Sequence, residues 1–288
     1  MVTLALLFAA KGVCDAAALN RMLEMSGVLD RPEVEVHILG DGTTRLHPPP
    51  PDGVRLHLAA ETLSVFRLWE TGIGRTMARY VAILDAQYVP APGWLDAVLD
   101  RLDDSPAAFF GPVEPAYSAQ DVRVIGYLTE YVQFHHQIIT TTTEVPGANL
   151  ILPRTATGDP TELAAHGFVK TALLGRMTPE LAPDCLVIHH KTFALGPYRR
   201  RRYRHGRAYA AHRLTQPGAP PRLAAALFTP ILPFLRLTRI HRHARRVETC
   251  RGAFWRFWPH LLWVEAGWSA GEFVGYLTGR GGDESLID

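Results

Sequence analysis

Short apolar runs alternate with segments of helical spacing over the first hundred residues. The apolar runs predict strands, at residues 2–9, 34–39, 54–58 and 80–85. The helical spacing predicts helices between them, at residues 16–27 and 63–80. Strands that alternate with helices are typical of a parallel sheet with crossover helices. The pattern therefore predicts an α/β fold with a mostly parallel sheet.

One of these apolar runs ends at a carboxylate. Residues 81–84 are continuously apolar, as in a strand that is buried on both faces, and Asp85 follows them directly. After a turn rich in proline and glycine, apolar residues return at helical spacing from Trp94 onward. Residues 85–87 are therefore expected at the carboxyl end of a central strand, where open parallel sheets bind their ligands.

The second half of the chain differs in its pattern of apolar and charged residues. Its patterns predict further strands and helices, with the strands at 107–114 and 185–188 and the helices at 122–139 and 166–177. From residue 217 onward, apolar and aromatic segments are flanked by arginine and are too short or too broken by proline to cross a bilayer. Such segments are typical of a membrane interface, and packing as an ordinary terminal subdomain is the alternative. We expect an α/β domain at 1–214 and an amphipathic helical region at 215–288.

Composition limits the class of protein. A chain of 288 residues with 47% apolar composition can bury a full core. Its three widely spaced cysteines argue against a disulfide framework or a zinc cluster and favour a reducing cytoplasm. The apolar N-terminal run has no basic residue before it, so we interpret it as a first strand and not as a signal peptide. Residues 185–247 are rich in arginine and lack Asp and Glu, but long apolar segments interrupt them, so we expect no nucleic-acid partner.

The segment around Asp85 resembles the Asp-x-Asp region of family-2 glycosyltransferases, which are inverting enzymes of the GT-A fold with nucleotide-sugar donors. The matching residues are Asp85-Ala86-Gln87, followed by Pro-x-Pro-Gly-Trp-Leu. Four further matches occur in the order of the family, namely Asp41-Gly42, Gly147 to Arg154, Pro183 to His189, and the arginine-rich residues 199–207. The resemblance implies a GT-A Rossmann-like, mostly parallel sheet flanked by helices, with the C-terminal helical region as an addition.

The resemblance also implies a donor site. Asp41 would accept hydrogen bonds from the nucleotide base, and Asp85, Gln87 and His189 would hold a divalent cation, Mn²⁺ or Mg²⁺, on the diphosphate. The residues expected to bind the donor are Ala10, Asp41, Asp85, Gln87, Asn149, Arg204 and Arg207. Plainer alternatives stay open, since an Asp before Gly is common in turns and a histidine at a strand end is often a satisfied core or surface residue. The arginines also suit anionic lipid head groups.

Two positions depart from the family pattern. Gln87 replaces a carboxylate that would bind the cation, and it offers only a neutral oxygen. Lys170 stands where the family has its catalytic base, and an ammonium group is unsuitable there unless burial lowers its pKa far. Glu144, Asp159 or Glu162 could serve as the base instead, and Lys170 could bind a phosphate or an acidic acceptor.

These features predict a hexosyltransferase-like enzyme that moves a sugar from a nucleotide-diphosphate donor to an acceptor hydroxyl with inversion. The acceptor would be a lipid, a lipid-linked compound or a glycan, since the C-terminal region suits a membrane surface. The expected location is the cytoplasm, with peripheral attachment to the inner face of the plasma membrane. The alternative is a catalytically silent GT-A-like protein that binds nucleotides or acts as a scaffold.

Overall fold

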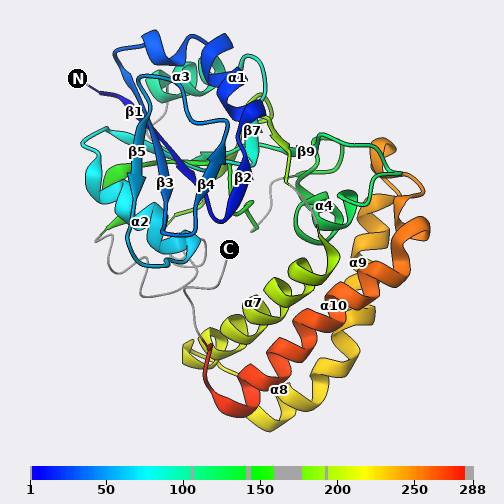
Figure 1. Cartoon of the computed structure of the whole chain (residues 1–288). Coiled ribbons are helices and arrows are strands. Elements are labelled where there is room, and N and C mark those ends of the chain that lie inside the picture. The colour runs from blue at the N-terminus through cyan, green and yellow to red at the C-terminus, as the bar shows by residue number, and fades with distance from the viewer. Residues whose placement is uncertain (1, 105–106, 141–143, 159–176, 192–193, 283–288) are drawn as a thin grey trace. The chain divides into compact units, whose positions relative to one another are not determined.

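The chain forms two compact units (Figure 1). The computed structural model describes residues 2–104, 107–140, 144–158, 177–191 and 194–282. Unit 1 comprises Met1–Ala116 and Phe134–Thr192, and unit 2 comprises Tyr117–Gln133 and Phe193–Asp288. Unit 1 contains the sheets and unit 2 is helical in its described residues. The predicted α/β fold with an added C-terminal helical region is therefore confirmed.

Unit 1 is organised around a seven-stranded sheet in the order β11-β8-β10-β6-β1-β3-β5. Its strands are β1 (Leu4–Ala9), β3 (Val34–Gly40), β5 (Arg55–Leu58), β6 (Tyr80–Asp85), β8 (Phe109–Phe110), β10 (Leu150–Pro153) and β11 (Glu180–Leu181). The strands β6, β1, β3 and β5 are parallel, whereas β10 is antiparallel to both of its neighbours. The four strands predicted from the first hundred residues are thus confirmed to within two residues at each end.

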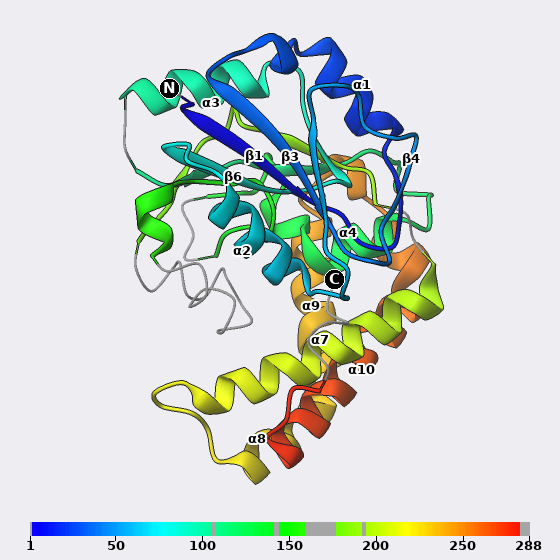
Figure 2. The same cartoon turned by 60° about the vertical axis from the view of Figure 1, so that its left-hand side comes forward.

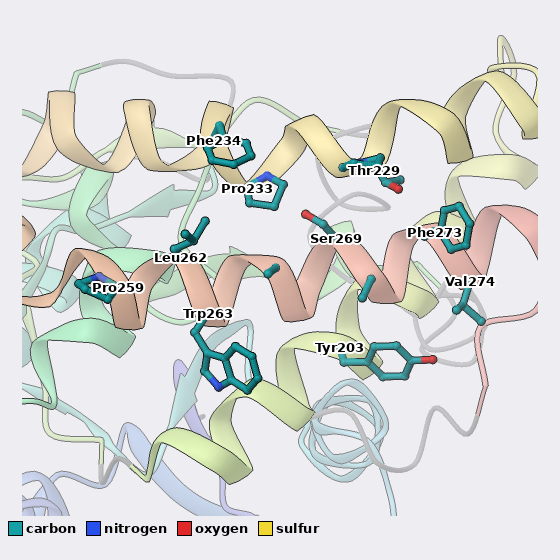
Figure 3. A pocket seen from close by; sticks show the side chains of 13 residues that line it. Tyr203, Thr229, Pro233, Phe234, Pro259, Leu262, Trp263, Ser269, Phe273 and Val274 are labelled. Atoms are coloured by element: carbon teal, nitrogen blue, oxygen red, sulfur yellow. The ribbon is translucent and has the colours of Figure 1, made fainter.

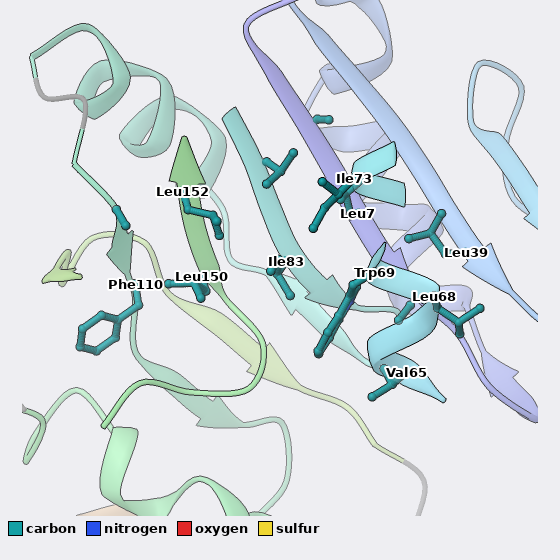
Figure 4. Close-up of a cluster of buried hydrophobic side chains, with 14 of the residues drawn as sticks. Leu7, Leu39, Val65, Leu68, Trp69, Ile73, Ile83, Phe110, Leu150 and Leu152 are labelled. Carbon is teal, nitrogen blue, oxygen red and sulfur yellow. The ribbon is translucent and has the colours of Figure 1, made fainter. Parts of the chain in front are cut away.

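Helix α2 (Val65–Arg75) packs in the core against the sheet that contains β6, the strand that ends in Asp85 (Figure 4). Its apolar residues recur every three to four positions, so Leu68, Trp69 and Ile73 share one face that packs into the cluster of buried sheet residues. Trp69 Nε1 also donates a hydrogen bond to Leu84 O at 2.8 Å. The helix therefore holds the end of β6 in place. The other helical segments in the described residues of unit 1 are α1 (Ala17–Met25), α3 (Trp94–Asp104), η1 (Val28–Asp30) and η3 (Arg154–Thr157).

Two small sheets complete unit 1. The strands β2 (Val13–Asp15) and β4 (Arg45–His47) are parallel partners. The other sheet has the order β7-β12-β9, with β7 (Tyr88–Pro90), β12 (Val187–His189) and β9 (Val113–Pro115). The single strand predicted at 107–114 is wrong in this respect, because β8 and β9 belong to different sheets. Gly111 lies so close to Cys185 that a Cβ atom would be 1.6 Å from Cys185 O, and Pro112 has no N–H for a ladder, so the chain changes sheets there.

Unit 2 consists of packed helices (Figure 2). They are α4 (Val124–Glu130), α7 (Leu195–Thr215), α8 (Arg222–Phe228), η4 (Thr229–Ile231), α9 (Leu232–Ala244), η5 (Glu248–Cys250) and α10 (Ala253–Thr278), while η2 (Val132–Phe134) spans the junction of the two units. Helices α7 and α10 are in close contact, since a Cβ on Gly271 would lie 2.0 Å from Tyr203 O and one on Gly206 would lie 2.2 Å from Trp268 O. The unit boundary therefore precedes α7, whereas the sequence placed it at residue 214.

Buried charges tie three helices of unit 2 together. Glu265 and Glu272 of α10 are 1% and 2% exposed, and each accepts a hydrogen bond from an arginine. Arg202 of α7 donates to Glu265 at 2.8 Å, and Arg236 of α9 donates to Glu272 at 2.9 Å. Both guanidinium groups also lie over the Trp268 ring, at 4.2 and 4.6 Å from its centroid. Charged residues inside an apolar helix are thus accounted for by pairing.

Candidate functional site

The carboxyl ends of three adjacent strands form the candidate site in unit 1. Strand β1 lies between β3 and β6, and Ala9 is level with Leu39 on one side and with Asp85 on the other. Adjacent strands are about 4.8 Å apart, so the Cα atoms of Leu39 and Asp85 are roughly 10 Å apart. Asp41 follows Leu39 by two residues. The predicted convergence of Asp41 and Asp85 at one sheet edge is therefore confirmed.

Asp41 is held by its own turn. Its Oδ1 accepts hydrogen bonds from Thr43 N at 2.9 Å and Thr43 Oγ1 at 2.5 Å, and its Oδ2 accepts one from Leu63 N at 3.1 Å. Burial raises the pKa of this carboxyl, but the hydrogen bonds from Thr43 and Leu63 outweigh burial and hold the pKa below its usual value. A carboxylate has about four acceptor positions, so Oδ2 can accept one further N–H. This geometry fits the turn that the sequence left open, and since Asp41 is only 1% exposed, its contact with a nucleotide base stays a prediction.

Asp85 and Gln87 place two side-chain oxygens at the end of β6. Asp85 Oδ1 accepts a hydrogen bond from Gln87 N at 2.8 Å, and Gln87 Nε2 lies 3.6 Å from Cys14 Sγ. Gln87 Oε1 is buried and has no hydrogen-bond partner among the described residues. Hard divalent cations are commonly held by one or two protein oxygens together with substrate phosphates. These residues therefore offer oxygens that fit a cation shared with a diphosphate, and cation binding by them stays a prediction.

His189 is the last residue of β12. It pairs with Tyr88 across the β7–β12 ladder, and the two rings meet at an edge with centroids 4.8 Å apart. His190 instead lies opposite Gln87 and donates its N–H to Gln87 O at 2.8 Å. Successive strand residues point to opposite faces. His190 is therefore better placed than His189 to share a face with Gln87, and the cation-binding role of His189 stays a prediction.

Asn149 has a structural role in the site. Its Nδ2 donates to Cys185 O at 2.6 Å and to Pro112 O at 3.2 Å, and its Oδ1 accepts from Trp94 Nε1 at 3.1 Å. Its φ of 66° lies in the left-handed region, which asparagine tolerates better than most residues. Both amide hydrogens are thus committed to backbone carbonyls. Asn149 therefore joins the segments of Trp94, Pro112 and Cys185, and its contact with a nucleotide-sugar stays a prediction.

The remaining predicted residues are placed as follows. Lys170, Asp159 and Glu162 lie outside the described residues. Glu144 is partly buried and lies before β10 in unit 1. Ala10 is buried, and its backbone N–H and C=O bond to Leu39 O and to Thr44 Oγ1, both at 2.8 Å. Arg204 and Arg207 belong to α7 of unit 2, where Arg207 Nε donates to Arg280 O at 3.1 Å. Their contact with a donor stays a prediction.

The sequence did not single out three residues near these strand ends, namely Lys11, Cys14 and Lys191. Lys11 acts electrostatically on Asp41, and Lys191 acts on Cys14. The Cys14 thiol is buried, and burial, followed by the charge of Asp85, raises its pKa. A signal was present, because Lys11 follows the end of β1 closely and Lys191 follows β12 closely. The rule that residues beyond parallel strand ends line a site would have found both lysines.

The comparisons with known proteins identify the fold. No known sequence family and no curated protein matches the chain. Among solved structures, the chain is similar to the mannosyltransferase PcManGT from Pyrobaculum calidifontis in complex with GDP-Man and Mn2+, with 15% identity, a TM-score of 0.50, and coverage of 95% of this chain and 86% of that chain. This likeness shows a GT-A-type glycosyltransferase fold, as the resemblance implied.

Two further solved structures were matched at lower similarity. Glucosyl-3-phosphoglycerate synthase from Mycobacterium tuberculosis has 12% identity and a TM-score of 0.45, with coverage of 76% of this chain and 80% of that chain. TarS from S. aureus has 11% identity and a TM-score of 0.45, with coverage of 97% of this chain and 92% of that chain.

Unit 2 carries an apolar groove of about 740 Å³ (Figure 3). Residues of α9 and α10 line most of it, including Phe234, Leu262, Trp263 and Phe273. Arg222–Ala244, which spans α8 to α9, is the one helix in the described part of the chain that is long and apolar enough to cross a membrane, judged by length and composition alone. The helix continues through its prolines because each of them lies in the first turn of a helical segment. The prediction that this region is too short or too broken by proline to cross a bilayer is therefore wrong for residues 222–244, by length and composition.

Proposed function

We propose that this protein is a glycosyltransferase that uses a nucleotide-diphosphate sugar. The observation that carries the proposal is the pair of carboxylates, Asp41 and Asp85, at strand ends on either side of β1 in a GT-A-type fold. In the proposed reaction, an acceptor hydroxyl attacks the anomeric carbon and the bond to the diphosphate breaks, with inversion at that carbon. A base takes the hydroxyl proton, and Glu144, Asp159 and Glu162 are the candidates.

Each residue at the carboxyl ends of β1, β3 and β6 would have a role that follows from its chemistry. Asp41 Oδ2 would accept an N–H of the nucleotide base. Asp85 and Gln87 would hold Mn²⁺ or Mg²⁺, which neutralises charge on the departing diphosphate when it is bound. Lys11 and Lys191 add positive charge near the same edge, and such preorganised charge is often the largest contribution to catalysis. Lys170 would contact a phosphate or an acidic acceptor.

The surface of unit 2 supports a lipid or lipid-linked acceptor. Large apolar side chains are exposed along α8, η4 and α9, namely Leu223, Leu227, Phe228, Ile231, Phe234 and Leu235. Residues 185–247 lack acidic side chains and are rich in arginine, which favours anionic lipid head groups. A surface that combines both features is typical of an interfacial helix. We infer peripheral binding to a membrane, with the cytoplasmic face of the plasma membrane as the proposed site.

A panel of nucleoside diphosphates tests the donor site. We expect one nucleotide to raise the melting temperature, and to do so more strongly with Mn²⁺ present, because a ligand that binds only the folded state stabilises it. At a hundred times its dissociation constant the ligand would add about 2.7 kcal/mol. Differential scanning fluorimetry measures the shift. Equal melting temperatures with all nucleotides, with and without Mn²⁺, would contradict the proposal.

A catalytically silent nucleotide-binding protein is the second candidate, and the neutral Gln87 in place of a carboxylate favours it. The two candidates differ in turnover. Release of the nucleoside diphosphate from the matching nucleotide-sugar indicates an enzyme, whereas binding without release indicates a silent protein. The same nucleotide panel supplies the compound for this assay.

Membrane binding is tested by charge substitution on the exposed helical surface. The double substitution Phe228→Asp and Phe234→Asp is expected to weaken binding to anionic vesicles more than tenfold, because burying each phenylalanine contributes about 1.5–3 kcal/mol. Sedimentation with phosphatidylglycerol-containing vesicles measures the bound fraction. Met77→Asp is the matched control, since Met77 is an exposed apolar residue of unit 1. Equal vesicle binding by the double variant and the control variant would contradict membrane attachment through unit 2.

A further inference from the structure

Glu114, His135 and His136 form a cluster that the proposed reaction does not use. Glu114 is the central residue of β9, and the two histidines directly follow η2. The atoms that these three residues could offer to a metal ion lie within 4.8 Å of one another. His136 Nδ1 is in direct contact with Glu114 Oε1. Residues that are distant in sequence thus bring two imidazoles and one carboxylate to one point of unit 1.

The three residues differ in burial, since His135 is buried whereas His136 and Glu114 are partly exposed. His135 is only 1% exposed, and its Nδ1 accepts a hydrogen bond from Gln137 N at 3.2 Å, so a metal ion at this nitrogen would replace that bond. Its carbonyl accepts hydrogen bonds from Ile138 N and Ile139 N, so the turn that carries it is closed. The side chains of His136 and Glu114 are 51% and 23% exposed. An ion could therefore reach the cluster from solvent past His136 and Glu114.

Two imidazoles and a carboxylate match the chemistry of borderline divalent metals. Zinc binds histidine nitrogen at about 2.0–2.1 Å and carboxylate oxygen at about 2.0–2.2 Å, and three protein ligands leave a fourth position open. Donor atoms around one such ion are roughly 3.3 Å apart, so a spread of up to 4.8 Å closes with modest rotation of the exposed side chains. We propose that Glu114, His135 and His136 bind a divalent transition metal, with Zn²⁺ as the preferred ion and with one position open to water.

This site is separate from the oxygen pair at Asp85 and Gln87. Glu114 pairs with Ile188 of β12, whereas Gln87 precedes β7 on the far side of β12. The Cα atoms of Glu114 and Gln87 are therefore two strand spacings apart across the sheet, or about 10 Å, with a further offset along the strands. The ligand types differ as well, because imidazole favours zinc and carboxylate or amide oxygen favours Mg²⁺ and Mn²⁺. Zinc binding by the cluster does not depend on sugar transfer.

Equilibrium dialysis of the untagged full-length protein against ZnCl₂ tests the proposal, with bound metal measured by mass spectrometry. We expect about one bound Zn²⁺ per chain and a rise in melting temperature with zinc. His136→Ala and Glu114→Gln change partly exposed residues, so both variants should fold, and each should bind zinc at least tenfold more weakly. His260→Ala is the control, because His260 is exposed on α10 of unit 2 and should not affect binding.

Three results would contradict zinc binding by Glu114, His135 and His136. Zinc binding that is unchanged in both His136→Ala and Glu114→Gln would overturn the proposal, and so would the absence of any stoichiometric zinc in the wild-type protein. Asp85→Asn should retain the bound zinc, and loss of zinc in that variant would assign the ion to the sheet edge instead. None of these outcomes involves a nucleotide-sugar, so failure here and failure of the proposed transfer reaction are distinguishable.

Discussion

Asp85→Asn is expected to lower the rate of sugar transfer by about a hundred- to a thousandfold, which is the usual effect of removing one group that stabilises transition-state charge. Asparagine keeps the shape of the side chain and can still accept a hydrogen bond from Gln87 N, but it has no charge for a cation. The end of β6 should keep its position, because Trp69 anchors it through the backbone of Leu84. Release of nucleoside diphosphate from the donor measures the rate.

The matched control is Asp52→Asn, since Asp52 is an exposed carboxylate of the same unit. It should leave the rate within a factor of about two, in keeping with the small effects of surface substitutions. The Mn²⁺ concentration for half-maximal rate gives a second readout, and it should rise in Asp85→Asn. Full activity of Asp85→Asn at an unchanged Mn²⁺ requirement would exclude the proposed role of this carboxylate.

Gly271→Leu is expected to destabilise unit 2 by on the order of 3 kcal/mol, because overpacking that displaces backbone is at the costly end of such substitutions. A Cβ at this position would lie 2.0 Å from Tyr203 O and 2.9 Å from Arg207 N, both of them backbone atoms of α7. The backbone of a helix cannot rotate away as a side chain can, so α7 and α10 must separate. Urea unfolding followed by circular dichroism measures the loss.

Gly196→Ala is the control for this substitution. Gly196 lies in α7 of the same unit, and a Cβ there would meet no atom within 4 Å. Alanine favours a helix over glycine by up to about 1 kcal/mol, but Pro197 disfavours a Cβ on the helical residue before it, so the control variant should be within about 1 kcal/mol of the wild type. If Gly271→Leu and Gly196→Ala unfolded at the same urea concentration, the close contact between α7 and α10 would be refuted.

The sequence predicted the central strands well because their signal is local. Residues 81–84 are apolar without interruption, so the strand, its burial and the carboxylate at its end could all be inferred. The separation of β8 from β9 could not, since it depends on how Gly111 meets the backbone of Cys185, which lies far along the chain. The structural role of Asn149 has the same origin, because its hydrogen bonds join segments that are distant in sequence.

Helix α7 groups with unit 2 by its contacts, whereas the sequence placed it before the boundary at residue 214, for a related reason. Its arginines lie all round the helix, so its sequence shows no apolar face that would predict a packing partner. It packs instead through Gly206, where the backbones of two helices meet, and through the buried Arg202. Neither feature has a signal in hydrophobic periodicity. The same limit explains why Glu114 and the adjacent histidines did not stand out, since only the fold brings them together.

The paired charges of unit 2 determine how the chain can be shortened. Arg202 and Arg236 find their carboxylates on α10, the last helix of the described chain. A truncation before residue 253 would remove the carboxylates of Glu265 and Glu272 from these guanidinium groups, and among the carboxylates of the described residues Arg202 would keep only its 3.9 Å contact with Glu130 of α4. Helices α7 and α9 would then lose the helix that each of them is paired with through a buried carboxylate. Serial deletion from the C-terminus would thus report on collapse of the bundle, and functions of its surface are separable only by substitutions that spare the two glutamates.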